Sequence, residues 1–136
     1  MERKVFTETP TNEQKNIYSL VLDAHERAVS KIQKGIKSSF LEKTVRNFLK
    51  TYEPYFTHAL GHGVGLEIHE SPSLSEKLWN KSNPQILEEN MLITIEPGIY
   101  LPEKFGIRLE NIYQVTKTGS KSLNTLSFEL KFNILV

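Results

Sequence analysis

The chain of 136 residues contains no cysteine. Disulfide bonds, thiolate nucleophiles and thiolate metal sites are therefore excluded, and any metal must be held by histidine and carboxylate side chains. Such a donor set suits a hard or borderline metal, and the missing cysteine is typical of a cytoplasmic protein. The length is close to one ordinary domain, so we expect a single folded unit over residues 1–136.

Long apolar runs and dense blocks of one charge are also missing. No stretch approaches the roughly 20 apolar residues of a membrane span, and the N-terminus lacks the apolar segment of a signal peptide. The 17 basic and 16 acidic residues give a net charge of +1, with no basic run. The sequence thus predicts a soluble protein that contacts neither a membrane nor nucleic acid.

Aspartate is nearly absent, since fifteen of the sixteen acidic residues are glutamate and only Asp23 is aspartate. Asp23 falls off the apolar stripe of a predicted helix, where we expect it to be solvated. His25, on the same helix, is interpreted as a surface residue. Neither side chain is therefore a candidate for a binding site.

Two helices are predicted first along the chain. Thr11 and Gln14 form a capping-box pattern, apolar residues follow at helical spacing, and Gly35 is expected to end this helix. A second helix is expected over residues 39–50. One short strand is expected before the helices, over residues 3–7, and others after them, over residues 91–95, 107–116 and 127–134, with an exposed connection at 72–90 and a turn at Gly119. Helices first and strands afterwards indicate an α+β domain.

Three of the four histidines, His58, His62 and His69, lie within twelve residues of the chain. The spacing of His58 and His62 would place both on one face of a helix, but Gly61 and Gly63 argue against a helix here. These glycines indicate unusual backbone torsions or a close approach to a ligand. The alternative is a glycine-rich turn with incidental histidines, and this segment alone leaves both interpretations open.

Two glutamates follow in short apolar segments, where a carboxylate is costly unless something compensates its charge. Glu96 ends the apolar run 91–95, and strand alternation places it on the same face as Thr94. Arg108 and Glu110 share a face of the predicted strand 107–116. The simpler interpretation of this second pair is a surface salt bridge, which contributes little.

Three signatures occur in order over this part of the chain. The first is His-x2-Gly-His-Gly-x-Gly from His58, with His-Glu-x-Pro following at His69; Glu-Pro-Gly-x-Tyr begins at Glu96 and Gly-x-Arg-x-Glu-Asn at Gly106. Together they resemble the catalytic domain of aminopeptidase P and prolidase, whose pita-bread fold is shared with creatinase and methionine aminopeptidase. The resemblance implies metal-dependent hydrolysis of a peptide bond that precedes proline, in longer peptides or in dipeptides.

The resemblance also assigns residues. His62, Glu96 and Glu110 match metal ligands of a two-metal centre that holds manganese, cobalt or zinc, with manganese favoured by the oxygen-rich donor set. His58 and His69 match histidines that contact the substrate and the developing oxyanion. Arg108 matches an arginine that orients its neighbours.

Both aspartate ligands of the family pattern are missing. The stretch that begins at Arg3 resembles the family's Asp-x-x-Arg-Thr-Phe, which would put the second aspartate immediately before Met1. The sequence is therefore interpreted as the C-terminal portion of a catalytic domain that lacks its first strands, an incomplete pita-bread fold with two N-terminal helices packed on a curved, mainly antiparallel sheet. We expect the isolated chain to bind at most one metal, weakly.

Several functions and partners follow from this interpretation. The leading hypothesis is an Xaa-Pro aminopeptidase, with an Xaa-Pro dipeptidase or a non-catalytic homologue that binds peptides or proteins as alternatives. A creatine amidinohydrolase receives no support from the sequence. The expected partners are a proline-containing peptide and either a second copy of the chain or a partner chain that supplies the missing strands, since a bare strand edge favours association.

Overall fold

A computed structural model describes residues 1–4, 6, 8–75 and 85–129 of the chain. Two helices come first in it. Helix α1 (Asn12–Val29) begins with the predicted capping box between Thr11 and Gln14. It ends before the predicted stop at Gly35, and the backbone N–H groups of Lys31 and Ile32 then bond three residues back, to Ala28 and Val29. Helix α2 (Ser38–Leu49) starts and ends one residue earlier than predicted, and a short 3₁₀ helix, η1 (Lys50–Tyr55), follows it.

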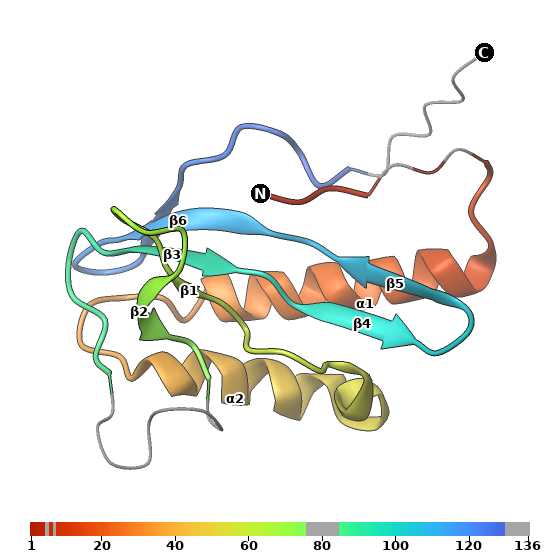
Figure 1. Cartoon of the computed structure of the whole chain (residues 1–136), viewed down its shortest axis with the longest axis horizontal. Helices are drawn as coiled ribbons and strands as arrows, with labels where there is room; N and C mark the ends of the chain where they lie inside the picture. Colours follow the sequence, from red (N-terminus) through yellow and green to blue (C-terminus); the bar gives the residue numbers. More distant parts are fainter. Residues whose placement is uncertain (5, 7, 76–84, 130–136) are drawn as a thin grey trace.

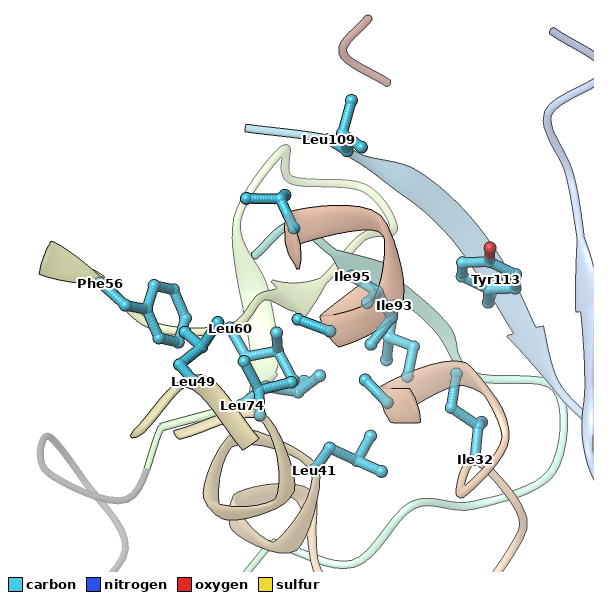
Figure 2. Packing of buried hydrophobic residues seen from close by; sticks show 14 of the residues in the cluster. Ile32, Leu41, Leu49, Phe56, Leu60, Leu74, Ile93, Ile95, Leu109 and Tyr113 are labelled. Atoms are coloured by element: carbon cyan, nitrogen blue, oxygen red, sulfur yellow. The ribbon is translucent and has the colours of Figure 1, made fainter. Parts of the chain in front are cut away.

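Each helix buries one apolar stripe, which explains why both form. Residues three and four apart face the sheet, and they are Ile17, Val21, Ala24 and Ala28 of α1 and Leu41, Val45 and Leu49 of α2. Figure 2 shows residues of both helices meeting side chains of the sheet, including Ile93 and Ile95. No helix among the described residues combines the length and apolar character needed to cross a membrane.

The prediction for His25 was wrong, whereas Asp23 is exposed as expected. Only 1% of His25 is exposed, because Tyr113 and Phe128 pack against its ring at centroid distances of 5.7 and 4.7 Å. Burial lowers the pKa of His25 to about 4, with a further contribution from the charge of Arg3. The helix position that looks polar in sequence is therefore covered by a segment from the far end of the chain.

Among the described residues, five strands form an antiparallel sheet and two form a separate hairpin. The order in the larger sheet is β2-β1-β3-β6-β7, and β4 pairs with β5. The strands are β1 (His62–Gly63), β2 (Glu70–Ser73), β3 (Leu92–Ile95), β4 (Gly98–Leu101), β5 (Phe105–Arg108), β6 (Asn111–Val115) and β7 (Ser120–Ser122). Helices with a mainly antiparallel sheet confirm the predicted α+β class.

The predicted strand 107–116 is wrong in one respect, because it divides into β5 and β6. β6 pairs with β3 from Ile95 opposite Asn111, whereas β5 pairs with β4 from Gly98 opposite Arg108. The same register runs through both pairs, so they form one long ribbon with a break in its ladder (Figure 1). Pro97 lies in this break and has no N–H to donate, which interrupts the ladder there.

The other strand predictions had mixed outcomes. The strand at 91–95 is confirmed as β3, and β7 follows the expected turn at Gly119. The described residues of the predicted strand 3–7 form no strand, and residues 5 and 7 lie outside the described part. Residues 127–129 of the predicted strand 127–134 form none either, and residues 130–134 lie outside the described part. In the predicted connection 72–90, β2 forms and Leu74 and Leu87 are fully buried, while residues 76–84 lie outside the described part.

The two faces of the larger sheet have different roles. Along β3, Ile93 and Ile95 pack toward the helices, so Thr94 must point to the opposite face. Both helices lie on one side of the sheet, and the N-terminal residues lie on the other (Figure 1). The helix-free face is therefore where polar side chains of the strands can gather.

Candidate metal centre

Glu96 and Glu110 both lie in the break of the long ribbon, between its two ladders. Because the register is the same on each side of the break, the two glutamates stand opposite each other on neighbouring strands. Side chains of directly opposed residues share a face and have Cβ atoms roughly 4.5–5.5 Å apart. The fold thus brings two of the predicted ligands to one place on the helix-free face.

His62 reaches the same place from β1, which pairs with β3. Its Nδ1–H donates to the carbonyl oxygen of Gly63 at 2.9 Å, which leaves Nε2 as the nitrogen that can carry the lone pair of a metal ligand. Nε2 is 3.4 Å from Oε1 of Glu96. Two electron-rich atoms at this distance need a cation or a shared proton between them, and a histidine held through its other nitrogen is typical of metal ligands.

Thr94 connects these two candidate ligands. Its hydroxyl accepts a hydrogen bond from the backbone N–H of His62 at 3.0 Å and donates to Oε1 of Glu96 at 3.1 Å. Thr94 is 2% exposed, so both bonds form in a largely dry environment. This hydroxyl therefore fixes the position of Glu96 relative to His62.

The third predicted ligand, Glu110, lines the same cavity but has a different partner. Its Oε1 accepts a hydrogen bond from the terminal amino group of Met1 at 3.1 Å. Its backbone pairs with that of Glu2 through two hydrogen bonds of 3.2 Å, an antiparallel bridge. Glu2 therefore stands opposite Glu110 on its other side, and the three glutamates Glu96, Glu110 and Glu2 form a row across the ribbon.

Arg108 offsets part of this negative charge. Its Nε donates to Oε2 of Glu2 at 2.6 Å and lies 3.9 Å from Oε2 of Glu96. The simpler sequence interpretation, a salt bridge between Arg108 and Glu110, is therefore replaced by a bond to Glu2. Burial raises the pKa of Glu2, but hydrogen bonds from Lys4 and Arg108 outweigh it and hold this pKa below its ordinary value. For Arg108, burial lowers the pKa, but the hydrogen bond to Glu2 and the negative charges of Glu2 and Glu96 together outweigh burial and raise this pKa above its ordinary value.

One cavity of about 420 Å³ gathers five of the six predicted site residues. It is lined by His62, His69, Glu96, Arg108 and Glu110, together with apolar residues such as Leu66 and Ile68. The ring of His69 lies 4.1 Å from that of His62 between centroids. The cavity therefore combines a polar wall of possible ligands with an apolar wall from the loop between β1 and β2.

His62 and Glu96 fit a divalent metal in donor chemistry and in orientation, since both are neutral or anionic acceptors that converge. Within the described ranges, no three histidine, aspartate or glutamate side chains group closely enough to hold a metal without movement. Asp23 contributes nothing here, because it lies on the exposed side of α1 beside Glu26 and Arg27. The pair His62 and Glu96 is therefore the assembled part of the candidate centre.

His58 lies apart from this cavity. It lines a neighbouring cavity of about 390 Å³ with Glu42, Arg46 and other residues. Its Nδ1–H donates to the carbonyl of Ala59 at 2.7 Å, which leaves Nε2 to accept from the hydroxyl of Tyr100 at 3.0 Å. Burial raises the pKa of Tyr100, although the charge of Arg108 acts in the opposite direction. Tyr100 therefore lies between His58 and the arginine of the candidate centre.

Gly61 and Gly63 are explained by close packing of backbones. A Cβ on Gly61 would collide with the carbonyl oxygen of Thr94, and one on Gly63 with the carbonyl oxygen of Ser71. Neither has the positive φ that Gly35 adopts. Left-handed torsions, one predicted reason, are therefore found at neither glycine, and the close approach is to neighbouring strands, whereas approach to a ligand stays a prediction. Gly61 lets the chain at β1 pass close to β3, which brings His62 beside Glu96, and Gly63 lets it pass close to β2.

Sequence reasoning missed Glu2, and it gave Thr94 and Tyr100 no role. Strand alternation already placed Thr94 on the face of Glu96, and Tyr100 stands in the signature that begins at Glu96, so both carried a signal. Nothing in the local sequence distinguishes Glu2 from other exposed glutamates. Its position depends on the bridge to Glu110, more than one hundred residues away in the chain.

Comparisons with known proteins agree with this geometry. The sequence profile of metallopeptidase family M24 matches residues 1–117. The Xaa-Pro dipeptidase of Pyrococcus horikoshii is 42% identical over 130 residues, which cover 94% of this chain and 36% of that protein. The chain thus spans about a third of the length of the relatives it matches.

Solved structures give the same result. The X-Pro aminopeptidase of Thermotoga maritima superposes with a TM-score of 0.87 at 39% identity, over 94% of this chain and 36% of that chain. The prolidase of Pyrococcus furiosus superposes with a TM-score of 0.85 at 40% identity, over 92% and 36%. These neighbours confirm the predicted part of a pita-bread fold. The chain belongs to metallopeptidase family M24.

Proposed function

We propose that the chain supplies one half of a metal-binding active site for the hydrolysis of Xaa-Pro dipeptides. The observation that carries this proposal is the pair formed by His62 Nε2 and Glu96 Oε1, 3.4 Å apart and oriented by Thr94 and by the carbonyl of Gly63. Dipeptides are favoured over longer peptides because similar proteins carry the names Xaa-Pro dipeptidase and prolidase. An X-Pro aminopeptidase is also among the similar structures, so the aminopeptidase hypothesis is tested beside it.

In this proposal His62, Glu96 and Glu110 hold a divalent metal, with manganese favoured by the oxygen-rich donors. When bound, such a metal lowers the pKa of water and polarises the carbonyl of the scissile bond. His69 is exposed beside His62 in the same cavity, where it can contact the peptide. His58 acts through its hydrogen bond to Tyr100 rather than within the cavity.

The substrate is tested by incubating the chain with Mn²⁺ and three compounds: an Xaa-Pro dipeptide, a longer Xaa-Pro peptide and creatine. Because the chain supplies only half of the metal site, we expect slow hydrolysis, with proline release from the dipeptide exceeding cleavage of the longer peptide and no reaction with creatine. Glu96→Gln should abolish the reaction, whereas Glu13→Gln on α1, a carboxylate bonded only to Lys104 at the surface, should not. Faster cleavage of the longer peptide would favour the aminopeptidase instead.

The metal is tested separately by titration with Mn²⁺. We expect at most one weak equivalent, because His62 and Glu96 converge while Glu110 is bonded to the amino group of Met1. His62→Ala and Glu96→Gln should each remove this binding. Two tight equivalents would contradict the proposed half-site.

A non-catalytic role has one observation in its favour: no three candidate ligands within the described ranges form a metal group. In that case the cavity would bind proline-containing peptides without hydrolysing them. Peptide binding that neither needs Mn²⁺ nor leads to cleavage would support this alternative.

We also propose that a second polypeptide, either a partner chain or another copy, covers the helix-free face of the sheet. Leu66 and Ile68 in the loop between β1 and β2 are 103% and 78% exposed, and Met1 beside them is 49% exposed. Exposed apolar side chains around a cavity are typical of an interface. Strands β2 and β7 also form the two edges of the larger sheet.

A further inference from the structure

Arg108 lies between two carboxylates at unequal distances. Its Nε is 2.6 Å from Oε2 of Glu2 and 3.9 Å from Oε2 of Glu96. Only the shorter contact is a hydrogen bond, and a bond between a guanidinium and a carboxylate is among the stronger ones in proteins. The geometry therefore assigns the arginine to Glu2 rather than to the candidate metal ligand.

The backbone explains why Glu2 can reach Arg108. Glu2 stands opposite Glu110 in the antiparallel bridge, and Arg108 precedes Glu110 by two residues on the same face. Arg108 is therefore the diagonal neighbour of Glu2. The other oxygen of Glu2 accepts from Nζ of Lys4 at 2.5 Å, so both carboxylate oxygens of Glu2 have a cationic partner.

Arg3 fixes this short segment from the other side. Its guanidinium donates to the carbonyl oxygens of Glu2 and Glu110 at 2.9 and 2.8 Å and to Oδ1 of Asn111 at 2.7 Å. It also lies 3.9 Å above the ring of Phe128. The backbone of Glu2 is thus held at the break of the ribbon independently of its own side chain.

We propose that Glu2 is a positioning residue that holds the guanidinium of Arg108 away from Glu96 and so leaves Glu96 available to a metal ion. The consequence for metal binding rests on the proposed function. The placement of Arg108 does not, because it concerns the metal-free protein.

The physical reason is competition between two cations for one carboxylate. Glutamine at position 2 keeps the shape of the side chain but loses its charge, so its bond to Arg108 is weaker. Glu96 is then the next carboxylate, and a small rotation of the arginine closes the gap of 3.9 Å. An arginine bonded to Glu96 opposes a metal at the same oxygens.

The first experiment follows the Arg108 Nε–H resonance in the metal-free chain by NMR, with Arg108→Lys used to assign it. We expect this resonance to move in Glu2→Gln and to show new contacts to the side chain of Glu96. In Glu13→Gln, which removes the carboxylate partner of Lys104 on the surface, it should stay in place. An Arg108 resonance that is unchanged in a folded Glu2→Gln variant overturns the proposal.

The second experiment titrates the same variants with Mn²⁺ and follows the signal of the free ion by electron paramagnetic resonance. We expect Glu2→Gln to weaken binding about tenfold, which corresponds to about 1.4 kcal/mol. In an Arg108→Gln background the same substitution should have no further effect, because the competing cation is gone. A loss of equal size in both backgrounds overturns the proposal.

The two experiments also separate this inference from the proposed function. A native chain that binds no Mn²⁺ refutes the metal-binding function, and the Arg108 resonance still decides whether Glu2 positions the arginine. A native chain that binds Mn²⁺ with an affinity unchanged in Glu2→Gln leaves the metal-binding function intact and refutes the role of Glu2.

Discussion

Replacement of Thr94 by valine tests the candidate centre most directly, because it removes one hydroxyl and keeps the shape of the side chain. Two hydrogen bonds are lost: the one that Thr94 accepts from the backbone N–H of His62 and the one that it donates to Glu96. The first loss leaves a backbone donor without its partner, at a cost of roughly 1–3 kcal/mol. The second removes a bond to a charged group, which contributes roughly 1.5–3 kcal/mol.

The two costs do not add in full, because water reaches the neighbouring side chains. The side chain of His62 is 20% exposed and that of Glu96 is 14% exposed, so solvent replaces part of what is lost. We therefore expect Thr94→Val to lower the free energy of unfolding by about 2–3 kcal/mol. Because Glu96 loses its fixed position, binding of Mn²⁺ should weaken as well.

Thr44→Val on α2 is the matched control. The hydroxyl of Thr44 donates to the carbonyl of Phe40 one turn earlier at 2.9 Å, near the surface, and its loss should change stability by less than about 0.5 kcal/mol. Urea denaturation followed by circular dichroism measures both variants under the same conditions. Equal stability of Thr94→Val and Thr44→Val would refute the role given to the Thr94 hydroxyl.

Three further predictions follow from the packing and exposure of single residues. Gly61→Ala should destabilise the chain by more than about 2 kcal/mol, because the added Cβ collides with the backbone of β3. Gly119→Ala should be nearly neutral in the same denaturation experiment, because its added Cβ would lie 3.9 Å from the nearest atom, the hydroxyl oxygen of Thr116. His25 has a pKa of about 4 in the folded chain against an unfolded value of 6.5, so only the unfolded state takes up its proton between these values. The free energy of unfolding should therefore fall by roughly 3 kcal/mol as the pH is lowered from 6.5 to 4. In His25→Leu, denaturation at the same pH values should lack this decrease. Light scattering after size exclusion should show association of the native chain that decreases when Leu66 and Ile68 are both replaced by serine; a native monomer that melts cooperatively would exclude a second copy of the chain as the cover of this face.

Local patterns predicted the helices well. The capping box at Thr11 and the apolar spacing of both helices depend only on residues within a few turns, and the structure confirms both. The burial of His25 was missed, because it depends on a distant segment that includes Phe128. Errors thus occur where packing overrides a local preference.

The candidate site shows the same division. The signatures selected His62, Glu96 and Glu110 as candidate ligands, which line one cavity, and strand alternation placed Thr94 on the face of Glu96. The separation of His58 from the main cavity and its contact with Tyr100 could not be predicted, because spacing along a chain does not fix which side of a sheet a loop enters.

By itself the sequence determined the donor chemistry. Without cysteine, and with one aspartate on a helix surface, only histidine and glutamate remain to hold a metal, and the ordered signatures place the chain in its family. Tertiary structure alone decided how these donors are arranged. A continuous register across the break at Pro97 sets Glu96 opposite Glu110, and the bridge between Glu2 and Glu110 brings a further carboxylate to Arg108. The bridge between Glu2 and Glu110 joins residues more than one hundred positions apart, and no local pattern specifies such a partner.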